Sequence, residues 1–102
     1  MKNIELRKYL TEVCGEQAII FDNPEFDSAI IGTCGSRIVY DYDKMVKSLS
    51  EDLVIEPIEA VDYIDYNSLR SLPYQNQEFA PIVIETLPEE VVSKWSYYLR
   101  IL

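Results

Sequence analysis

The stretch SAIIGTCGSRIVYDY, residues 28–42, decides the fold. Two runs rich in β-branched and aromatic residues, 28–33 and 37–42, flank a short loop that contains Gly35. This spacing is typical of a β-hairpin. Gly32, inside the first run, indicates a bulge or a close backbone approach. The residues that share the apolar face of the second run are Ile38, Tyr40 and Tyr42.

Two further elements precede the hairpin. Residues 3–14 predict a helix, because Asn3 is a suitable N-cap and Gly15 is a natural stop. Residues 18–21 then predict a short strand, which the turn-forming residues 22–25 end. The periodicity places on the inner side of the helix Leu6, Tyr9, Leu10 and Val13.

Two helices are expected after the hairpin. Asp43 is the expected N-cap of the first, and the second begins near Pro57. The inner side of the first helix is expected to carry Met45, Val46, Leu49 and Leu53. The inner side of the second helix is expected to carry Ile58, Val61 and Leu69. Asp65 falls on the same face as the second group. Either the helix breaks near this residue, or its carboxylate takes part in a hydrogen bond.

The C-terminal part of the chain completes the pattern. Residues 81–85 predict a further strand, and residues 88–102 predict an amphipathic helix. The resulting order, αβββααβα, indicates a single α+β domain over residues 1–102. We expect a small, mostly antiparallel sheet of three to four strands, packed with three to four helices.

Charge is the strongest global signal. Eighteen acidic residues against nine basic ones give a formal net charge of -9 and an isoelectric point near 4.3. Such a chain repels phosphate groups, so we expect no direct binding to nucleic acid and none to a membrane. The simpler interpretation, that the acidity serves solubility alone, stays open at this stage.

The same sequence indicates a cytoplasmic location. The first residues carry no apolar core of a secretory signal, and no apolar run approaches the roughly 20 residues of a membrane helix. Cys14 and Cys34 form no CxxC motif, so we expect two reduced, structural cysteines. A disulfide between them and a reactive Cys34 beside Arg37 are the alternatives.

The residue types that catalysis needs are scarce. The chain contains no His, which removes the usual general base and the partner of Ser or Cys nucleophiles. Two cysteines alone are too few for a zinc site, so we expect no metal and no cofactor. Residues 22–27 lack the spacing of a calcium loop, and residues 32–36 lack the Lys of a phosphate-binding loop. We therefore expect no enzyme, with catalysis by paired carboxylates as the open exception.

The most concentrated feature is residues 48–69, which carry six carboxylates and no Lys or Arg. They are Glu51, Asp52, Glu56, Glu59, Asp62 and Asp65. Tyr63 and Tyr66 are interleaved with them, and residues 40–43 form a second acidic and aromatic stretch. Tyrosines among carboxylates suit a basic protein groove of the kind that normally holds nucleic acid.

These eight residues are therefore predicted to bind the basic surface of another protein, as a nucleic-acid mimic does. The alternative is that the tyrosines are half-buried core residues and the carboxylates a solvated helix face.

The C-terminal helix supports a second hypothesis about function. Residues 88–102 hold more aromatic and apolar surface than one inner stripe needs, and such a surplus is typical of subunit interfaces. The residues in question are Trp95, Tyr97, Tyr98 and Ile101. A homodimer or larger homo-oligomer with a structural or assembly role is therefore the alternative.

Four segments carry a resemblance to a known family. They are residues 26–32 (FDSAIIG), 37–45 (RIVYDYDKM), 59–67 (EAVDYIDYN) and 81–84 (PIVI). Together they resemble small acidic proteins encoded in phages and mobile elements of Gram-positive gut bacteria. That family has no assigned activity, so the resemblance implies no site residue. It implies a genomic setting in which acidic proteins inhibit host defence or nucleic-acid-handling proteins, which favours the mimic hypothesis.

Overall fold

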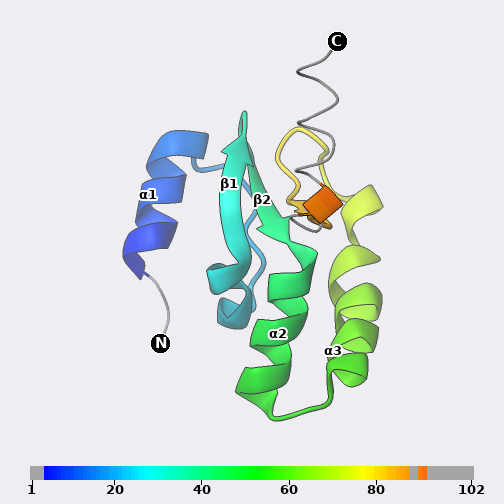
Figure 1. The fold of residues 1–102 in the computed structure, drawn as a ribbon. Coiled ribbons are helices and arrows are strands. Elements are labelled where there is room, and N and C mark those ends of the chain that lie inside the picture. The colour runs from blue at the N-terminus through cyan, green and yellow to red at the C-terminus, as the bar shows by residue number, and fades with distance from the viewer. Residues whose placement is uncertain (1–3, 88–89, 92–102) are drawn as a thin grey trace, which may run out of the picture.

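The hairpin forms the centre of the fold (Figure 1). The computed structural model describes residues 4–87 and 90–91. Strands β1 (Ile30–Cys34) and β2 (Arg37–Asp41) pair antiparallel, as the sequence predicts. Gly35 in the connecting loop has a φ of 62°, a conformation that residues with a side chain rarely adopt. The pairing register shifts between Ile30 and Gly32, which confirms the predicted bulge.

A third strand joins the hairpin from a distant part of the chain. Strand β3 (Ile82–Ile84) pairs with β2 in parallel, and the strand order is β1-β2-β3. The α+β class and the small sheet are confirmed. The sheet is mixed where the sequence indicated a mostly antiparallel one, because β3 follows β2 through a long helical crossover rather than a tight turn.

Helices fill the rest of the described chain. α2 (Tyr42–Leu53) continues directly from β2, and α3 (Pro57–Tyr63) returns beside it (Figure 1). α3 runs on into a π-helix, η2, at Ile64–Leu69. The remaining helical elements are α1 (Ile4–Cys14) and two short 3₁₀ helices, η1 (Pro24–Ala29) and η3 (Leu72–Tyr74). The helices predicted at residues 3–14 and from Pro57 are thereby confirmed.

The predicted N-cap of α2 was wrong. Asp41, the last residue of β2, caps the helix, and its Oδ1 accepts a hydrogen bond from the backbone N–H of Lys44 at 3.3 Å. Its Oδ2 accepts a weaker one from Thr86 Oγ1 at 3.4 Å, which links the start of α2 to the chain after β3. Asp43 instead lies exposed in the first turn, where its charge complements the helix dipole.

The strand predicted at residues 18–21 was wrong as well. The N–H of Ile19 donates to the carbonyl of Phe79 at 3.0 Å, which lies in a loop. Phe21 donates its N–H to the hydroxyl of Tyr40 at 3.1 Å, and its carbonyl accepts from Arg7 Nη2 at 3.0 Å. Loop and side-chain partners thus satisfy backbone groups that a strand would pair with a neighbouring strand.

The core lies between α1, the hairpin, η1, α2 and the inward side of α3 and η2. Three aromatic rings form its centre: Phe21 stands edge-on to Phe26 at 5.8 Å between centroids and lies 4.8 Å from Tyr40. α1 contributes a narrow stripe through Leu10 and Cys14, one helical turn apart. Two residues that the sequence placed on its inner side, Tyr9 and Val13, are exposed, and so is Leu53 on α2.

The helix predicted at residues 88–102 lies outside the described residues, apart from Glu90 and Val91, which are helical. Across the described ranges, no helix combines the length and the apolar character that crossing a membrane requires.

Candidate functional site

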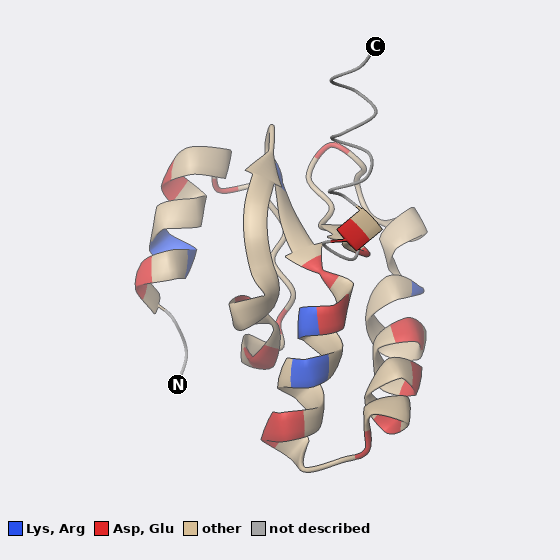
Figure 2. Cartoon of the chain, in the orientation of Figure 1, with Lys and Arg blue, Asp and Glu red and all other residues tan. Residues whose placement is uncertain are grey.

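The six predicted carboxylates are all exposed, but they form two groups. Glu51 and Asp52 lie in the last turns of α2, a helix that also carries Lys44 and Lys47 (blue in Figure 2). The other four follow one another from the N-cap of α3 into η2, where Figure 2 shows red along the ribbon; they are Glu56, Glu59, Asp62 and Asp65. Residues 56–69 contain no Lys or Arg, so the second group has the more negative surroundings.

The buried side of α3 and η2 differs from the one that the periodicity indicated. The inward residues are Ala60, Ile64 and Ser68, at steps of four, whereas Ile58 is 67% exposed. A π-helix places more residues in each turn than an α-helix. Ser68, four residues after Ile64 in η2, stays on the buried side.

Asp65, the second residue of η2, is exposed rather than inward. Its Oδ1 accepts a hydrogen bond of 3.0 Å from the hydroxyl of Tyr42 on α2. Both alternatives that the sequence left open therefore apply, because the α-helical geometry ends before Asp65 and its carboxylate is hydrogen-bonded.

Four of the eight predicted residues line one open hollow of about 560 Å³, here named the tyrosine hollow. Its lining residues are Asp62, Tyr63, Asp65, Tyr66, Asn67 and Arg70. The other four predicted residues, on α2 and at the start of α3, do not line it.

The two tyrosines of the hollow have different roles. Tyr66 is 68% exposed, and the guanidinium carbon of Arg70 lies 4.9 Å from its ring centroid. This cation–π contact holds the ring on the surface and adds a positive charge that the acidic stretch itself lacks. Tyr63 is 36% exposed, and its hydroxyl accepts a hydrogen bond of 3.2 Å from Asn23 Nδ2, so it also anchors α3 to the loop before η1.

The second acidic and aromatic stretch, residues 40–43, does not form one continuous exposed surface. Tyr40 and Asp41 are buried, Tyr40 in the aromatic core and Asp41 as the cap of α2. For these two residues the prediction was wrong, because the alternation of β2 turns Tyr40 inward and the helix start uses Asp41, whereas Tyr42 is half-buried and Asp43 is exposed.

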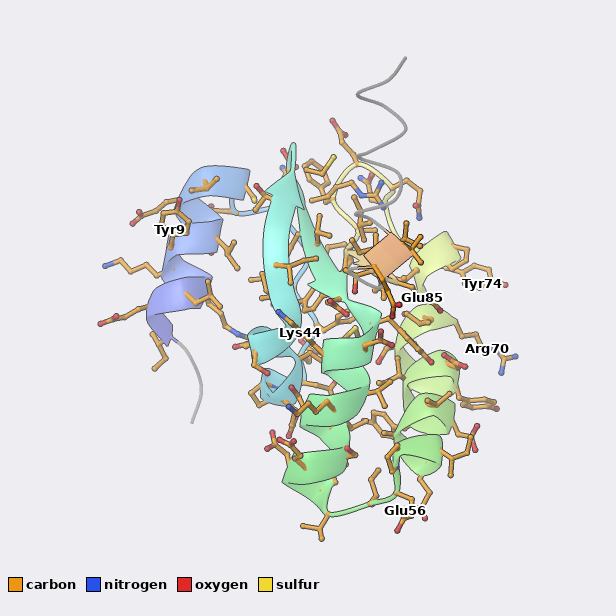
Figure 3. The ribbon with its side chains drawn as sticks, viewed as in Figure 1. Tyr9, Lys44, Glu56, Arg70, Tyr74 and Glu85 are labelled. Atoms are coloured by element: carbon orange, nitrogen blue, oxygen red, sulfur yellow. The ribbon has the colours of Figure 1, made fainter. Side chains whose placement is uncertain are left out.

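A second, smaller hollow of about 290 Å³, here named the strand-end pocket, shares Asp65 with the first. It lies where the parallel strands β2 and β3 end, since Tyr42 and Glu85 directly follow them. Figure 3 labels Glu85 in this region, while Arg70, directly after η2, and Tyr74, in η3, project outward from the molecule. The lining residues are Tyr42, Asp65, Leu69, Leu72, Val83 and Glu85.

Sequence reasoning missed this pocket, Glu85 included. Its residues come together because β3 pairs with β2 in parallel, and no local sequence pattern predicts this pairing. The available signal was a polar residue directly after each of two strands, because the carboxyl ends of parallel strands meet at one edge of a sheet.

Tyr42 is the titratable group at the centre of the strand-end pocket. The pKa of Tyr42 is raised from 10.0 to about 12, chiefly by burial and then by the hydrogen bond to Asp65 and the charges of Asp65, Glu85 and Asp43. The pocket is therefore a site of negative potential around a neutral hydroxyl.

This pKa predicts a loss of stability in alkaline solution. The pKa of Tyr42 is higher in the folded chain than in the unfolded chain, so the protonated hydroxyl favours the folded state. This contribution to stability is complete below about pH 10 and is lost as the pH rises through about 12. In Tyr42→Phe, the urea midpoint is expected to fall less between about pH 9 and about pH 11.5 than in the wild type. Tyr74→Phe, at an exposed position, should keep the wild-type dependence. An unchanged dependence in Tyr42→Phe would contradict the assignment.

Within the described part of the chain, no group of three or more Cys, Asp or Glu side chains is placed to hold a metal ion. Cys14 is buried and Cys34 exposed, and both are free thiols. No protein-family model, curated protein or solved structure matches the chain.

Proposed function

We propose that the protein is a non-enzymatic binding protein that presents the acidic side of α3 and the tyrosine hollow to a basic surface of another protein. The carboxylates of Glu59, Asp62 and Asp65 and the ring of Tyr66 act together there. Such a surface competes with nucleic acid for a basic groove by offering carboxylates where phosphates would lie.

One observation carries this proposal: the acidic residues of α3 and η2 remain exposed and lack an ion-pair partner. Among residues 4–87 and 90–91 the single ion pair joins Arg7 on α1 and Asp27 in η1, away from α3 and η2 in the chain. Carboxylates that only supported the fold would be expected to have cationic or hydrogen-bonding neighbours. Among the described residues the side chains of Glu59 and Asp62 have neither, whereas Asp65 accepts one hydrogen bond, from Tyr42. The resemblance to acidic phage proteins supports a host defence or nucleic-acid-handling protein as the partner.

Charge reversal tests the proposal with a defined probe, a fluorescently labelled oligoarginine peptide, whose binding is followed by anisotropy. Glu59→Lys/Asp62→Lys is expected to weaken binding about tenfold, since each exposed pair is worth up to about 1 kcal/mol. Binding to the wild type should also weaken as the salt concentration rises.

The matched control is Glu12→Lys/Glu16→Lys, which changes the net charge equally at two exposed positions of α1 and the following turn. It is expected to stay within about threefold of the wild type, because screening limits charges at a distance. Equal weakening by both double variants would show that binding follows net charge alone, and the proposed surface would then be rejected.

A further inference from the structure

The strand-end pocket has a chemistry of its own, distinct from the open tyrosine hollow beside it. One part of its wall is apolar, from Leu69 and Leu72 on the helical crossover and Val83 on β3. The other part is acidic, from Asp65 and Glu85. A ligand that fits both parts needs a short carbon stem and a positively charged end.

The acidic groups of the pocket are available to a ligand. Within the described residues, Glu85 forms no hydrogen bond or ion pair, and Asp65 uses only its Oδ1, towards Tyr42. The hydroxyl of Tyr42 donates its proton to Asp65, so the lone pairs of the hydroxyl oxygen remain free to accept from an incoming N–H. Three acceptor groups therefore border the apolar wall.

The size of the pocket limits the occupant. A volume of about 290 Å³ lies at the lower end of ligand sites, which suits one side chain better than a larger molecule. Its position outside the carboxyl ends of parallel strands is where open sheets commonly bind ligands.

We propose that the strand-end pocket binds a single arginine side chain of the partner protein. The inference rests on the proposed function, in which the partner surface is basic. Arginine fits better than lysine, because its planar guanidinium donates several hydrogen bonds in fixed directions and can reach two carboxylates and a hydroxyl at once. Its three methylene groups lie against Leu69, Leu72 and Val83.

The test uses Nα-acetyl-L-arginine amide as a probe of one side chain, with binding followed by protein NMR. We expect saturable shifts at the methyl groups of Leu69, Leu72 and Val83, with roughly millimolar affinity. The citrulline analogue keeps the shape of arginine but is neutral, and it should produce no saturable shifts. The lysine analogue should bind several-fold more weakly than arginine.

Glu85→Gln removes one pocket charge outside the acidic side of α3. It is expected to weaken binding of the arginine probe about tenfold, since charge-assisted hydrogen bonds are the strong ones. The matched variant Glu78→Gln, at an exposed loop position that does not line the pocket, should bind as the wild type does. Preserved spectra in the absence of probe establish that both variants fold.

Several results would overturn the inference: shifts that do not saturate, equal binding of the citrulline probe, or no effect of Glu85→Gln. These results are independent of the oligoarginine experiment. If the single-residue probe occupies the pocket while Glu59→Lys/Asp62→Lys leaves oligoarginine binding unchanged, the pocket stands and the proposed surface fails. If instead the single-residue probe does not occupy the pocket while Glu59→Lys/Asp62→Lys weakens oligoarginine binding, the pocket is rejected and the proposed surface is retained.

Discussion

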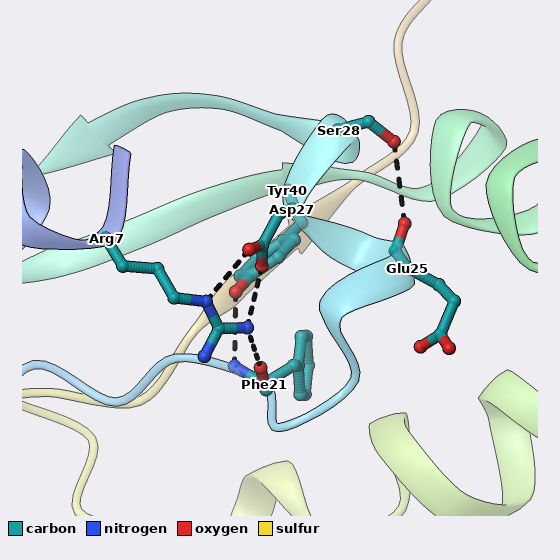
Figure 4. A network of polar contacts seen from close by, with 6 residues as sticks. All are labelled: Arg7, Phe21, Glu25, Asp27, Ser28 and Tyr40. Atoms are coloured by element: carbon teal, nitrogen blue, oxygen red, sulfur yellow. Dashed lines mark hydrogen bonds and ion pairs between the residues drawn. The ribbon is translucent and has the colours of Figure 1, made fainter. Parts of the chain in front are cut away.

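Replacing Asp27 by alanine is expected to lower the free energy of unfolding by about 3 kcal/mol. Figure 4 shows the network that this substitution breaks. Arg7 on α1 donates from Nε and Nη2 to the two carboxylate oxygens of Asp27, each at 2.8 Å, and Nη2 also donates to the carbonyl of Phe21 at 3.0 Å. The bond to Asp27 is the largest cause of the raised pKa of Arg7.

The size of the effect follows from burial. Asp27 is 5% exposed and the Arg7 side chain 31%, so the loss should fall at the lower end of the range for buried pairs. The pair also holds α1, which otherwise contacts the core through a narrow stripe. Amides of α1 should therefore exchange with solvent faster in the variant, beyond the change seen in α2.

Chemical denaturation measures the loss, with Asp22→Ala as control. Asp22 is exposed and near the same guanidinium, and its removal should cost less than about 0.5 kcal/mol. Arg7→Met/Asp27→Leu, which replaces the pair by apolar groups, should recover at least about 1 kcal/mol. Equal losses for Asp27→Ala and Asp22→Ala would show that the pair contributes nothing beyond surface charge.

The second large effect is expected at Phe26, whose side chain is fully buried in η1. Phe26→Ala should lower the free energy of unfolding by about 4 kcal/mol, through lost apolar burial and the cavity that remains. The ring contacts Phe21 edge-on, and η1 packs against α2, so the cavity opens between the hairpin and the helical crossover.

Urea denaturation again measures the effect, and Tyr74→Ala is the control. Tyr74 is an aromatic residue that is 90% exposed, so its removal should change the free energy by less than about 0.5 kcal/mol. If Phe26→Ala does not fold, Phe26→Leu should fold with a loss of about 1–2 kcal/mol. A loss below about 1 kcal/mol in Phe26→Ala would contradict the central position of this ring.

The candidate surface was partly predictable from sequence. The exposure of Asp62 follows from composition, since a run without cations cannot bury several carboxylates. Whether Tyr66 is exposed or half-buried was left open by the sequence. Local sequence patterns do not predict how the acidic residues divide between two helices, nor that Arg70 contacts Tyr66. Both features depend on how α2 and α3 pack. On α3 and η2 the prediction was wrong for Ile58, which is exposed, whereas Leu69 packs against the core. Ala60 and Ser68 were missed because small side chains carry a weak hydrophobic signal yet permit close packing.

The hairpin at residues 28–42, its glycine turn, its bulge and most helix positions could be predicted from local sequence. Those features depend on neighbours in the chain: the φ angle that glycine allows, the alternation of strand side chains, and the periodicity of helices. The tertiary structure decided the rest. The parallel pairing of β3, the irregular path of residues 18–21 and the outward position of Asp65 all depend on partners far away in the chain. The strand-end pocket exists for the same reason, because Tyr42, Asp65 and Glu85 meet only when β3 joins β2 in parallel.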